Sequence, residues 1–308
     1  ENDRTVGIPT VLKPDAMFGN PGVMLEGWDL VKILPDLTTR AVEYIDTRSQ
    51  QDPHQPFFLY FPMCPPHSPI VPAAEFTGKS GIAGKEGKYA DWVYQGDHML
   101  GQIMDALKRT GQEKNTLMIA TGDNGAARRP YPPLREAKSS IYEGGHREPF
   151  VARWPGKINA GSVNHDVICL NDLFATCADI LGDDLPPDAA EDSVSILPGL
   201  LGKTTGPIRE ATIHQAPAGL AIRQGPWKLV MYRNGNRELY NLKDDISETR
   251  DRSQTNREVA GRLEKLMQSY IDRGRSTPGP VQKNEFELPF GNSETKKRNK
   301  KKNSSKGK

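Results

Sequence analysis

The chain has 308 residues, of which 36% are hydrophobic and 26% are charged. These values are typical of a globular protein, and the length fits one large domain or a large domain with a small one. The net charge of +2 gives no reason to expect a specific nucleic-acid partner. No run of about 18 apolar residues occurs, so we predict no transmembrane segment. Three cysteines, Cys64, Cys169 and Cys177, are too few for a disulfide framework and form no C-x-x-C pair.

The first third of the chain predicts one helix and one buried strand. Residues 1–28 are rich in Gly and Pro and show no period. A helix opens near Leu34 with an apolar stripe at Ala41, Val42 and Ile45, and Asp36 or Thr38 is placed to cap it. The apolar run 56–62 lies between prolines and predicts a strand buried on both faces. The Pro- and Gly-rich residues 64–89 predict a long loop, which in a compact domain is typically functional or disordered.

Helix and strand patterns then alternate. A helix is predicted over 89–110, ending at Gly111, and strands over 115–120 and 150–154. A further helix is predicted over 171–181. The apolar positions expected to face inward are Val93, Met99, Leu100, Ile103, Met104 and Leu107 in the first helix and Leu173, Phe174, Cys177, Ile180 and Leu181 in the second. This alternation favours an α/β sheet covered on both faces.

The pattern changes after about residue 205. Short alternating strands are predicted over 219–223, 227–232 and 238–242, and Asn234-Gly235 is a strong hairpin signal between the last two. A helix over 256–272 carries one apolar face. We therefore predict three parts: residues 1–205 as an α/β domain, 206–282 as a small antiparallel sheet with a packed helix, and 283–308 as a disordered tail.

The tail is strongly basic, with eight Lys or Arg among residues 294–308 and no apolar side chain. Such a block cannot bury enough surface to offset its ordering entropy, so disorder is the expectation. The alternative to a merely solvated tail is a tail that binds polyanions.

Three polar constellations follow or lie between the predicted strands. Asp123-Asn124-Gly125 offers a carboxylate and an amide oxygen, which are hard ligands suited to Ca²⁺ or Mg²⁺. His67 lies between prolines that fix its backbone, and it is placed to donate to an anionic ester or to protonate a leaving group. Lys138 precedes Gly144-Gly145 and supplies a compact positive charge for a sulfate or phosphate oxygen.

Each of these features alone also fits an ordinary turn, an exposed loop histidine or a surface lysine. Together they supply a cation site, a hydrogen-bond donor and a charge clamp, which is what a tetrahedral anionic ester requires. Glu143, Arg147 and Glu148 are expected to form an ion-pair network that braces the Lys138 loop.

The order and spacing of several blocks resemble type I sulfatases, in particular the arylsulfatase A and N-acetylgalactosamine-6-sulfatase group. The blocks, which run from about residue 30 to 250, are Phe57-Phe58-Leu59-Tyr60 leading to Pro66-His67-Ser68-Pro69, Gly87-Lys88-Tyr89 with Asp97, Thr121-Gly122-Asp123-Asn124-Gly125, the segment Lys138 to Pro149, Trp154-Pro155-Gly156, Asp172-Leu173 and Glu238-Leu239-Tyr240-Asn241-Leu242. The resemblance implies an alkaline-phosphatase-like mixed sheet sandwiched by helices.

The resemblance also implies roles. Asp123 and Asn124 would be two of four protein ligands of Ca²⁺, and His67 and Lys138 would contact the sulfate ester, with Lys138 bridging the sulfate and the ester oxygen. His146 and His214 are further candidates to line the substrate pocket, with a structural role as the alternative for each. The substrate would be a sulfate monoester of a glycan or an aryl alcohol, and the family habit of export would place the protein in the periplasm or outside the cell.

One departure from the family is serious. The family nucleophile is a formylglycine made from Cys or Ser in a Cys-x-Pro-Ser-Arg motif, and none of the three cysteines begins that motif. The N-terminal half of the calcium site is also missing. We therefore expect a fragment whose sheet is incomplete at its N-terminus and which is inactive alone.

Two other functions stay open: a phosphoester hydrolase of the alkaline-phosphatase-like group, and a non-catalytic module that binds sulfated glycans. An upstream Cys- or Ser-x-Pro-Ser-Arg motif would exclude the binding module, and a metal-phosphatase motif there would favour the phosphoester hydrolase.

Overall fold

The computed structural model describes residues 3–52, 54–127, 129 and 131–285. It forms two compact units, residues 1–116 and 117–308, and each is described by itself. The predicted boundary near residue 205 stays a prediction, and nearly all of the predicted basic tail lies outside the described residues. No helix in the described part of the chain has the length and apolar character needed to cross a membrane.

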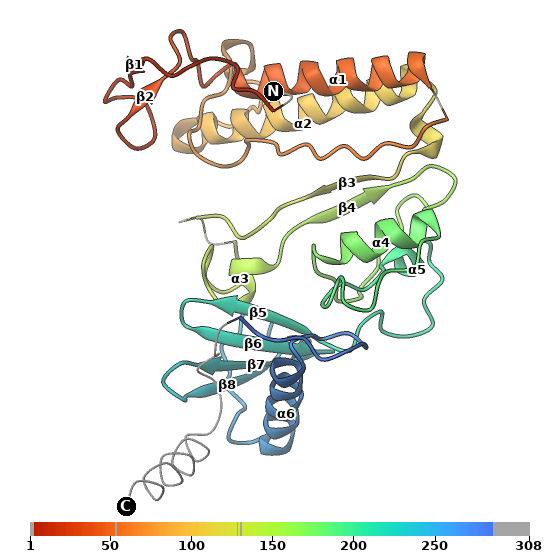
Figure 1. The fold of residues 1–308 in the computed structure, drawn as a ribbon. Helices are drawn as coiled ribbons and strands as arrows, with labels where there is room; N and C mark the ends of the chain where they lie inside the picture. The colour runs from red at the N-terminus through yellow and green to blue at the C-terminus, as the bar shows by residue number, and fades with distance from the viewer. Residues whose placement is uncertain (1–2, 53, 128, 130, 286–308) are drawn as a thin grey trace, which may run out of the picture. The chain divides into compact units, whose positions relative to one another are not determined.

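The first unit is built on two long helices that lie side by side (Figure 1), α1 (Ile33–Gln51) and α2 (Gly87–Arg109). Leu34 and Ile45 of α1 and Trp92 of α2 are almost completely buried. Gly111 follows α2 with φ +75°, as the predicted cap requires. Both predicted helices are thus confirmed, and their apolar stripes form the core of this unit together with the loop that joins them. Short strands β1 (Val11–Leu12) and β2 (Val23–Met24) pair before α1.

Three details of this unit differ from the sequence prediction. Neither Asp36 nor Thr38 caps α1: its N-cap is Lys32, and the Thr38 hydroxyl donates to the Leu34 carbonyl 2.8 Å away inside the helix. Val93 is exposed on α2.

The third difference concerns residues 56–62, which do not form a strand. Phe58 and Tyr60 are 75% and 76% exposed, whereas Phe57, Leu59 and Phe61 are half-buried. The segment is covered on one face only: Phe57 packs against Tyr44 of α1 and Phe61 against the core of this unit, whereas the other face is exposed. A run of apolar residues cannot by itself distinguish one covered face from two.

The second unit begins with the antiparallel pair β3 (Met118–Thr121) and β4 (Phe150–Arg153). Both strands were predicted. Thr121 at the end of β3 pairs with Phe150 at the start of β4, so residues 122–149 leave and re-enter the sheet at the same end of these strands. This connecting segment, the excursion, carries Asp123, Asn124 and Lys138, and it contains the short helix α3 (Glu143–His146).

Helix α4 (Asp172–Leu181) forms where predicted but presents a different face to the interior. Phe174, Ile180 and Leu181 are 59%, 38% and 64% exposed, so the prediction that they face inward is wrong. Leu173 and Cys177 are half-buried. The buried face instead carries Asp172, which is fully buried and paired with Arg209 at 2.9 Å. The Asp172 carboxylate also accepts the amides of Cys169 at 2.7 Å and Val194 at 3.0 Å. These charge-assisted contacts hold α4 with Asp172 facing inward. The short α5 (Leu197–Leu200) packs nearby.

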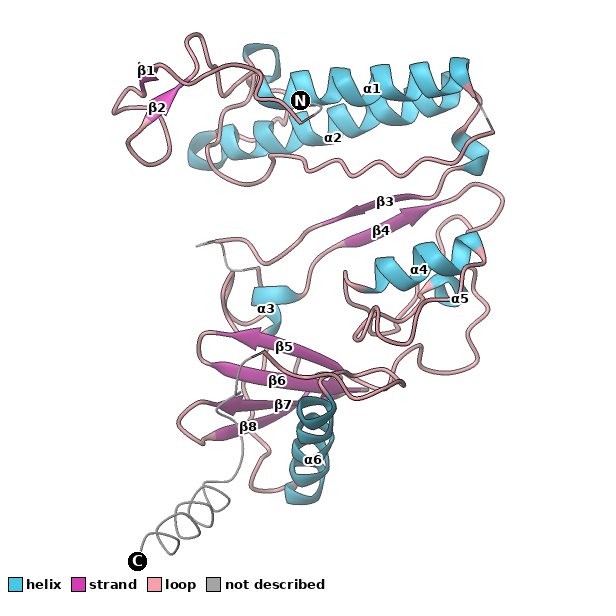
Figure 2. Cartoon of the chain, viewed as in Figure 1, coloured by secondary structure: helices cyan, strands magenta, loops and turns pink. Residues whose placement is uncertain are grey.

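The C-terminal part is a four-stranded antiparallel meander of β5 (Thr212–Ala216), β6 (Gly219–Gln224), β7 (Trp227–Tyr232) and β8 (Arg237–Asn241), followed by α6 (Arg257–Arg273) (Figure 2). Of these five elements, the sequence analysis predicted all but β5. The β7–β8 hairpin turns at Gly235, whose φ of +90° favours glycine.

The two faces of this sheet differ. One face is apolar and packs on α6 through Leu220, Ile222, Leu229 and Leu239. The other face alternates apolar and polar side chains, with Ala221, Val230 and Tyr240 packed against Ile141 and Tyr142. The sheet is therefore buried on both faces, and the second face is covered by the same excursion that carries Lys138.

Candidate active site

The two halves of the excursion pack backbone against backbone. The Gly125 amide donates to the Gly145 carbonyl at 3.0 Å, and the Lys138 amide donates to the Ala126 carbonyl at 3.4 Å. A Cβ on Gly125 would lie 1.9 Å from the Gly144 carbonyl oxygen, and one on Gly145 would lie 2.1 Å from that of Ser140. Only glycine permits this approach. The structure thus explains why Asp-Asn-Gly and Gly-Gly occur together: they bring the Asn124 turn and the Lys138 loop into contact.

A cavity of about 490 Å³ opens where this excursion meets β5. Its lining comprises Asn124, Lys138, Ser139, Ser140, Gly145, His146, Ile213, His214, Gln215, Ala216 and Pro217. This cavity is therefore lined by four of the six candidate residues, Asn124, Lys138, His146 and His214. They lie up to 90 positions apart in the sequence. Their roles remain predictions, but the juxtaposition is what a site for a polar anionic ligand requires.

Lys138 enters this cavity from a strained loop. Ser139, the next residue, has φ +71°, a left-handed conformation that costs a non-glycine residue about 1–3 kcal/mol and is concentrated at functional sites. The Lys138 side chain is exposed, and among the described residues its ammonium has no hydrogen-bond or ion-pair partner. The group is therefore a free positive charge at the cavity wall.

Asp123 lies just outside the cavity, beside a second carboxylate. The pKa of Glu148 is raised by its burial and then by the negative charge of Asp123. Within the described residues neither carboxylate pairs with a cation, and no cluster of three or more His, Cys, Asp or Glu is placed to hold a metal ion. Two unneutralised carboxylates next to the Asn124 amide fit part of the oxygen shell of a hard divalent cation.

His67 belongs to the first unit, on the loop between α1 and α2. Its amide donates to the Cys64 carbonyl at 3.0 Å, and its carbonyl accepts the indole N–H of Trp92 at 3.1 Å. The ring Nδ1 lies 2.6 Å from the Ser68 carbonyl oxygen, which favours the tautomer with the proton on Nδ1. The loop is thus anchored to α2, and Nε2 of the exposed ring is left to accept or donate a proton.

His146 and His214 form a stacked pair. Their ring centroids are 3.8 Å apart, with an angle of 20° between the planes. Nε2 of His146 lies 3.3 Å from Glu143 Oε1, but neither ring nitrogen of His146 is aligned for a hydrogen bond. Burial lowers the pKa of both imidazoles, and for His214 the neighbouring His146 and Lys228 lower it further. Both rings are therefore neutral at physiological pH.

The neutral pair predicts a loss of stability in mild acid. The folded-state pKa values lie below the ordinary 6.5, so below that pH the unfolded chain binds more protons than the folded chain. The free energy of unfolding should be level above about pH 7 and fall as the pH drops through 6.5, by up to about 1.4 kcal/mol per pH unit for each histidine. Urea unfolding at pH 7.5 and 5.5 measures the difference, and H214F should reduce it; equal stability at both pH values would show that the pair does not stay neutral.

Beneath the pair lies a buried ionic network that joins the excursion to the sheet. Lys228 of β7 is 0% exposed, with Nζ 3.0 Å from Glu143 Oε1 and 2.8 Å from Glu248 Oε1. Glu248 Oε2 in turn accepts the Glu143 amide at 2.6 Å. Arg147 and Arg223 approach Glu143 Oε2 at 3.2 and 3.5 Å. Burial raises the pKa of Glu143, but the contact with His146 and the charges of Lys228 and Arg223 hold it below its usual range.

Only part of this network was predicted. Glu143 and Arg147 pair as expected, but Glu148 takes no part. Lys228, Glu248 and Arg223 were missed. The available signal was the strand pattern: Lys228 alternates with apolar neighbours in a stretch that reads Trp-Lys-Leu-Val-Met-Tyr, so it lies at an inward position of a sheet that proves to be covered on both faces.

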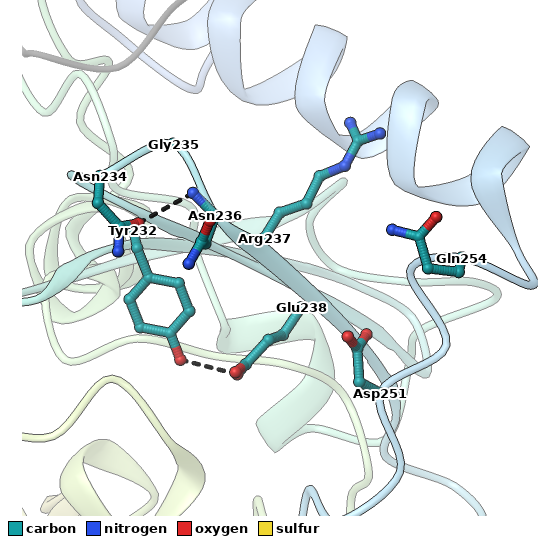
Figure 3. Close-up of a pocket in the computed structure, with 8 residues that line it drawn as sticks. All are labelled: Tyr232, Asn234, Gly235, Asn236, Arg237, Glu238, Asp251 and Gln254. Carbon is teal, nitrogen blue, oxygen red and sulfur yellow. Dashed lines mark hydrogen bonds between the residues drawn. The ribbon is translucent and has the colours of Figure 1, made fainter.

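A second cavity, of about 540 Å³, lies at the β7–β8 hairpin, between Tyr232, Glu238 and Asp251 (Figure 3). Glu238 Oε2 accepts hydroxyls from Tyr142 at 2.8 Å, Tyr232 at 2.7 Å and Tyr240 at 2.8 Å. Burial and this carboxylate raise the pKa of Tyr232 to about 12. The Arg135 guanidinium covers the Tyr142 ring at 3.6 Å. Because its polar groups are satisfied by one another, this cluster fastens the excursion to the sheet and offers no free group for chemistry.

The cysteines also offer no nucleophile. All three are free and half-buried. Burial raises the pKa of Cys64 and Cys169, so their reactive thiolate forms are disfavoured.

Comparison with known proteins agrees with this architecture. Residues 35–183 match the family model described as Sulfatase. N-acetylgalactosamine-6-sulfatase of Mus musculus is 36% identical over 171 residues, covering 53% of this chain and 32% of that protein. N-acetylgalactosamine-6-O-sulfatase of Bacteroides thetaiotaomicron is 31% identical over 298 residues, covering 87% of this chain and 55% of that protein. The chain thus spans at most about half the length of these relatives.

Solved structures give the same result. A 6S-sulfatase from glycosaminoglycan metabolism in Bacteroides thetaiotaomicron superposes with a TM-score of 0.70 at 31% identity, over 79% of this chain and 55% of that one. The phosphonate monoester hydrolase of Agrobacterium radiobacter shares the fold, with a TM-score of 0.57 at 22% identity over 76% of this chain and 60% of that one. The fold is the mixed α/β architecture of alkaline-phosphatase-like hydrolases. Within that class, the chain is similar to sulfatases, and its residues 35–183 match the sulfatase family model.

Proposed function

We propose that the whole protein hydrolyses sulfate monoesters and that the cavity between the excursion and β5 is its substrate site. The observation that carries this proposal is the convergence of Lys138, Asn124 and two neutral imidazoles on one cavity. A free ammonium at the wall attracts a sulfate group, and its charge is worth most where the transition state places negative charge on the ester oxygen. Lys138 would contact the sulfate and the bridging ester oxygen.

Asp123 and Asn124 would hold a Ca²⁺ ion, with further ligands from outside residues 1–308. The two carboxylates of Asp123 and Glu148 concentrate negative charge at the end of β3, which favours a divalent cation there. When bound, the ion would polarise the sulfate oxygens as a Lewis acid. Nitrogen and sulfur ligands suited to zinc are not gathered at this position among the described residues.

His67 would contact the sulfate ester and pass a proton to the departing alcohol through Nε2, since its Nδ1 faces the Ser68 carbonyl. We propose that the nucleophile is a formylglycine from a part of the whole protein outside this chain, because the three cysteines present are half-buried and outside the required motif. The chain alone is then expected to be inactive. Export to the periplasm or the exterior follows as a proposal from the family.

The similarity to N-acetylgalactosamine-6-sulfatases makes N-acetylgalactosamine 6-sulfate the first substrate to test. A D123A variant of the full-length protein should release sulfate from it at least about a hundredfold more slowly than the wild type. It should also lose the stabilisation by Ca²⁺, which for a single site reaches about 2.7 kcal/mol at a hundred times the dissociation constant. Ion chromatography of released sulfate and thermal unfolding with and without Ca²⁺ measure the two effects.

The matched control is D188A, which removes an exposed carboxylate from the same unit. It should behave as the wild type. Undiminished sulfate release by D123A, or an equal Ca²⁺ response in D123A and D188A, would remove Asp123 from the metal site.

A further inference from the structure

His214 is a polar side chain of the cavity to which the proposed chemistry gives no role in the reaction. His214 lies on β5, half-buried, and its imidazole makes no hydrogen bond to any described residue. The two ring nitrogens of His146 are buried without a hydrogen-bond partner, whereas those of His214 are open to the cavity. The imidazole of His214 can therefore bond to water or to a ligand that enters the cavity.

The ring of His214 is held in place rather than mobile. His146 stacks on it at 3.8 Å, and His146 in turn lies 3.3 Å from Glu143, which is fixed by Lys228. A preorganised side chain loses little rotamer entropy on binding, so it discriminates between ligands better than a free one does.

The charges around His214 define which partner it accepts. Burial lowers the pKa of His214 most, and the stacked His146, Lys228 of β7 and Arg223 of β6 lower it further, whereas Glu143 raises it. A neutral imidazole has one donor and one acceptor nitrogen. That combination matches a hydroxyl or amide group, which can both give and accept a hydrogen bond. It matches a sulfate group less well, because sulfate only accepts.

We propose that His214, backed by His146, is a specificity-determining residue that hydrogen-bonds an uncharged hydroxyl or amide of the alcohol half of the ester. This rests on the proposed function and narrows its substrate to sulfated sugars with such a group near the ester, in preference to simple aryl sulfates. Lys138 binds the charged half of the ligand, and His214 binds the neutral half. His146 is then a positioning residue, since it acts through the ring of His214.

The test compares a sugar ester with an aryl ester on the full-length protein. The quantity compared is kcat/KM for N-acetylgalactosamine 6-sulfate divided by kcat/KM for p-nitrophenyl sulfate. H214F should lower this ratio roughly three- to tenfold, mainly by raising the KM for the sugar ester. H214N keeps a donor and an acceptor and should recover part of the ratio. H146F keeps a ring for stacking and should change the ratio less than H214F does.

A binding measurement makes the result independent of turnover. The affinities for N-acetylgalactosamine 6-sulfate and for inorganic sulfate can be measured by isothermal titration calorimetry. H214F should weaken binding of the sugar sulfate roughly three- to tenfold more than binding of inorganic sulfate. Equal weakening of both ligands, or equal loss of activity on both esters, would reduce His214 to a structural role and overturn the proposal. A wild type that binds with this selectivity but hydrolyses neither ester would overturn the proposed function alone.

Discussion

Replacing Lys138 by alanine should lower the turnover of a sulfate ester by about two to three orders of magnitude in the full-length protein. The side chain is exposed at the cavity wall, and its ammonium has no partner among the described residues, so its removal leaves no buried charge behind. Folding should therefore be intact. The loss should appear in kcat as well as in kcat/KM, because the charge on the bridging oxygen develops in the transition state.

The matched control for this variant is K203A, an exposed lysine of the same unit that does not line the cavity. It should retain wild-type kinetics. Steady-state rates with p-nitrophenyl sulfate and circular dichroism decide the outcome. Near-normal turnover of K138A would exclude the role that we give to Lys138, whereas a loss of folded signal would show that the loop depends on it structurally.

Replacing Lys228 by methionine should destabilise the second unit by about 3–5 kcal/mol, because it leaves the carboxylates of Glu143 and Glu248 buried without their shared cation. Both carboxylates are 1% exposed or less. Glu143 accepts a well-aligned hydrogen bond from Lys228 at 3.0 Å. Glu248 Oε1 is close at 2.8 Å but not aligned for a hydrogen bond. Burial accordingly raises the pKa of Glu248, whereas that of Glu143 is lowered.

Urea unfolding followed by tryptophan fluorescence measures this effect, with Trp227 next to the substituted residue. The triple variant K228M/E143Q/E248Q should recover much of the loss, because neutral amides need no counter-ion. K243M, at an exposed position, is the control and should stay within about 0.5 kcal/mol of the wild type. A loss below about 1 kcal/mol in K228M would indicate that water or protonation already neutralises the carboxylates.

The network matters to function because it fixes the site to the C-terminal sheet. The face of this sheet opposite α6 carries Arg223, Lys228, Glu238 and Tyr240, and all four contact the excursion. The small sheet is therefore a platform for the loop that carries Lys138, and its β5 strand supplies His214 to the cavity wall. Removing this part of the chain should disorder the site even though it contributes neither Asp123, Asn124 nor Lys138.

Much of the secondary structure could be predicted from the sequence, because periodic patterns of apolar residues reflect local backbone geometry. The β7–β8 hairpin followed from Asn234-Gly235, and α6 from its single apolar face. The orientation of α4 could not be predicted from the sequence, because it depends on the pairing of Asp172 with Arg209, which lies 37 positions later in the chain. The prediction for residues 56–62 failed for a related reason: the number of covered faces is set by neighbours that the segment itself does not encode.

The candidate site was predicted as a set of residue types rather than as a geometry. Asp123, Asn124 and Lys138 were singled out from loops next to strands, and the glycines at 125, 144 and 145 explain how two of these loops meet. His146 and His214 carried no local signal that would relate them. Their stacking depends on the packing of β5 against α3, which only the folded chain reveals.

The most direct test of the central claim is a comparison of two esters of the same alcohol by the full-length protein. With Ca²⁺ present, p-nitrophenyl sulfate should be hydrolysed with a kcat/KM at least about a hundredfold above that of p-nitrophenyl phosphate, a difference of roughly 2.7 kcal/mol in transition-state stabilisation. A preference for the phosphate ester would contradict the account and favour a phosphoester hydrolase. Tight binding of a sulfated sugar with hydrolysis of neither ester would instead identify a sulfated-glycan-binding module.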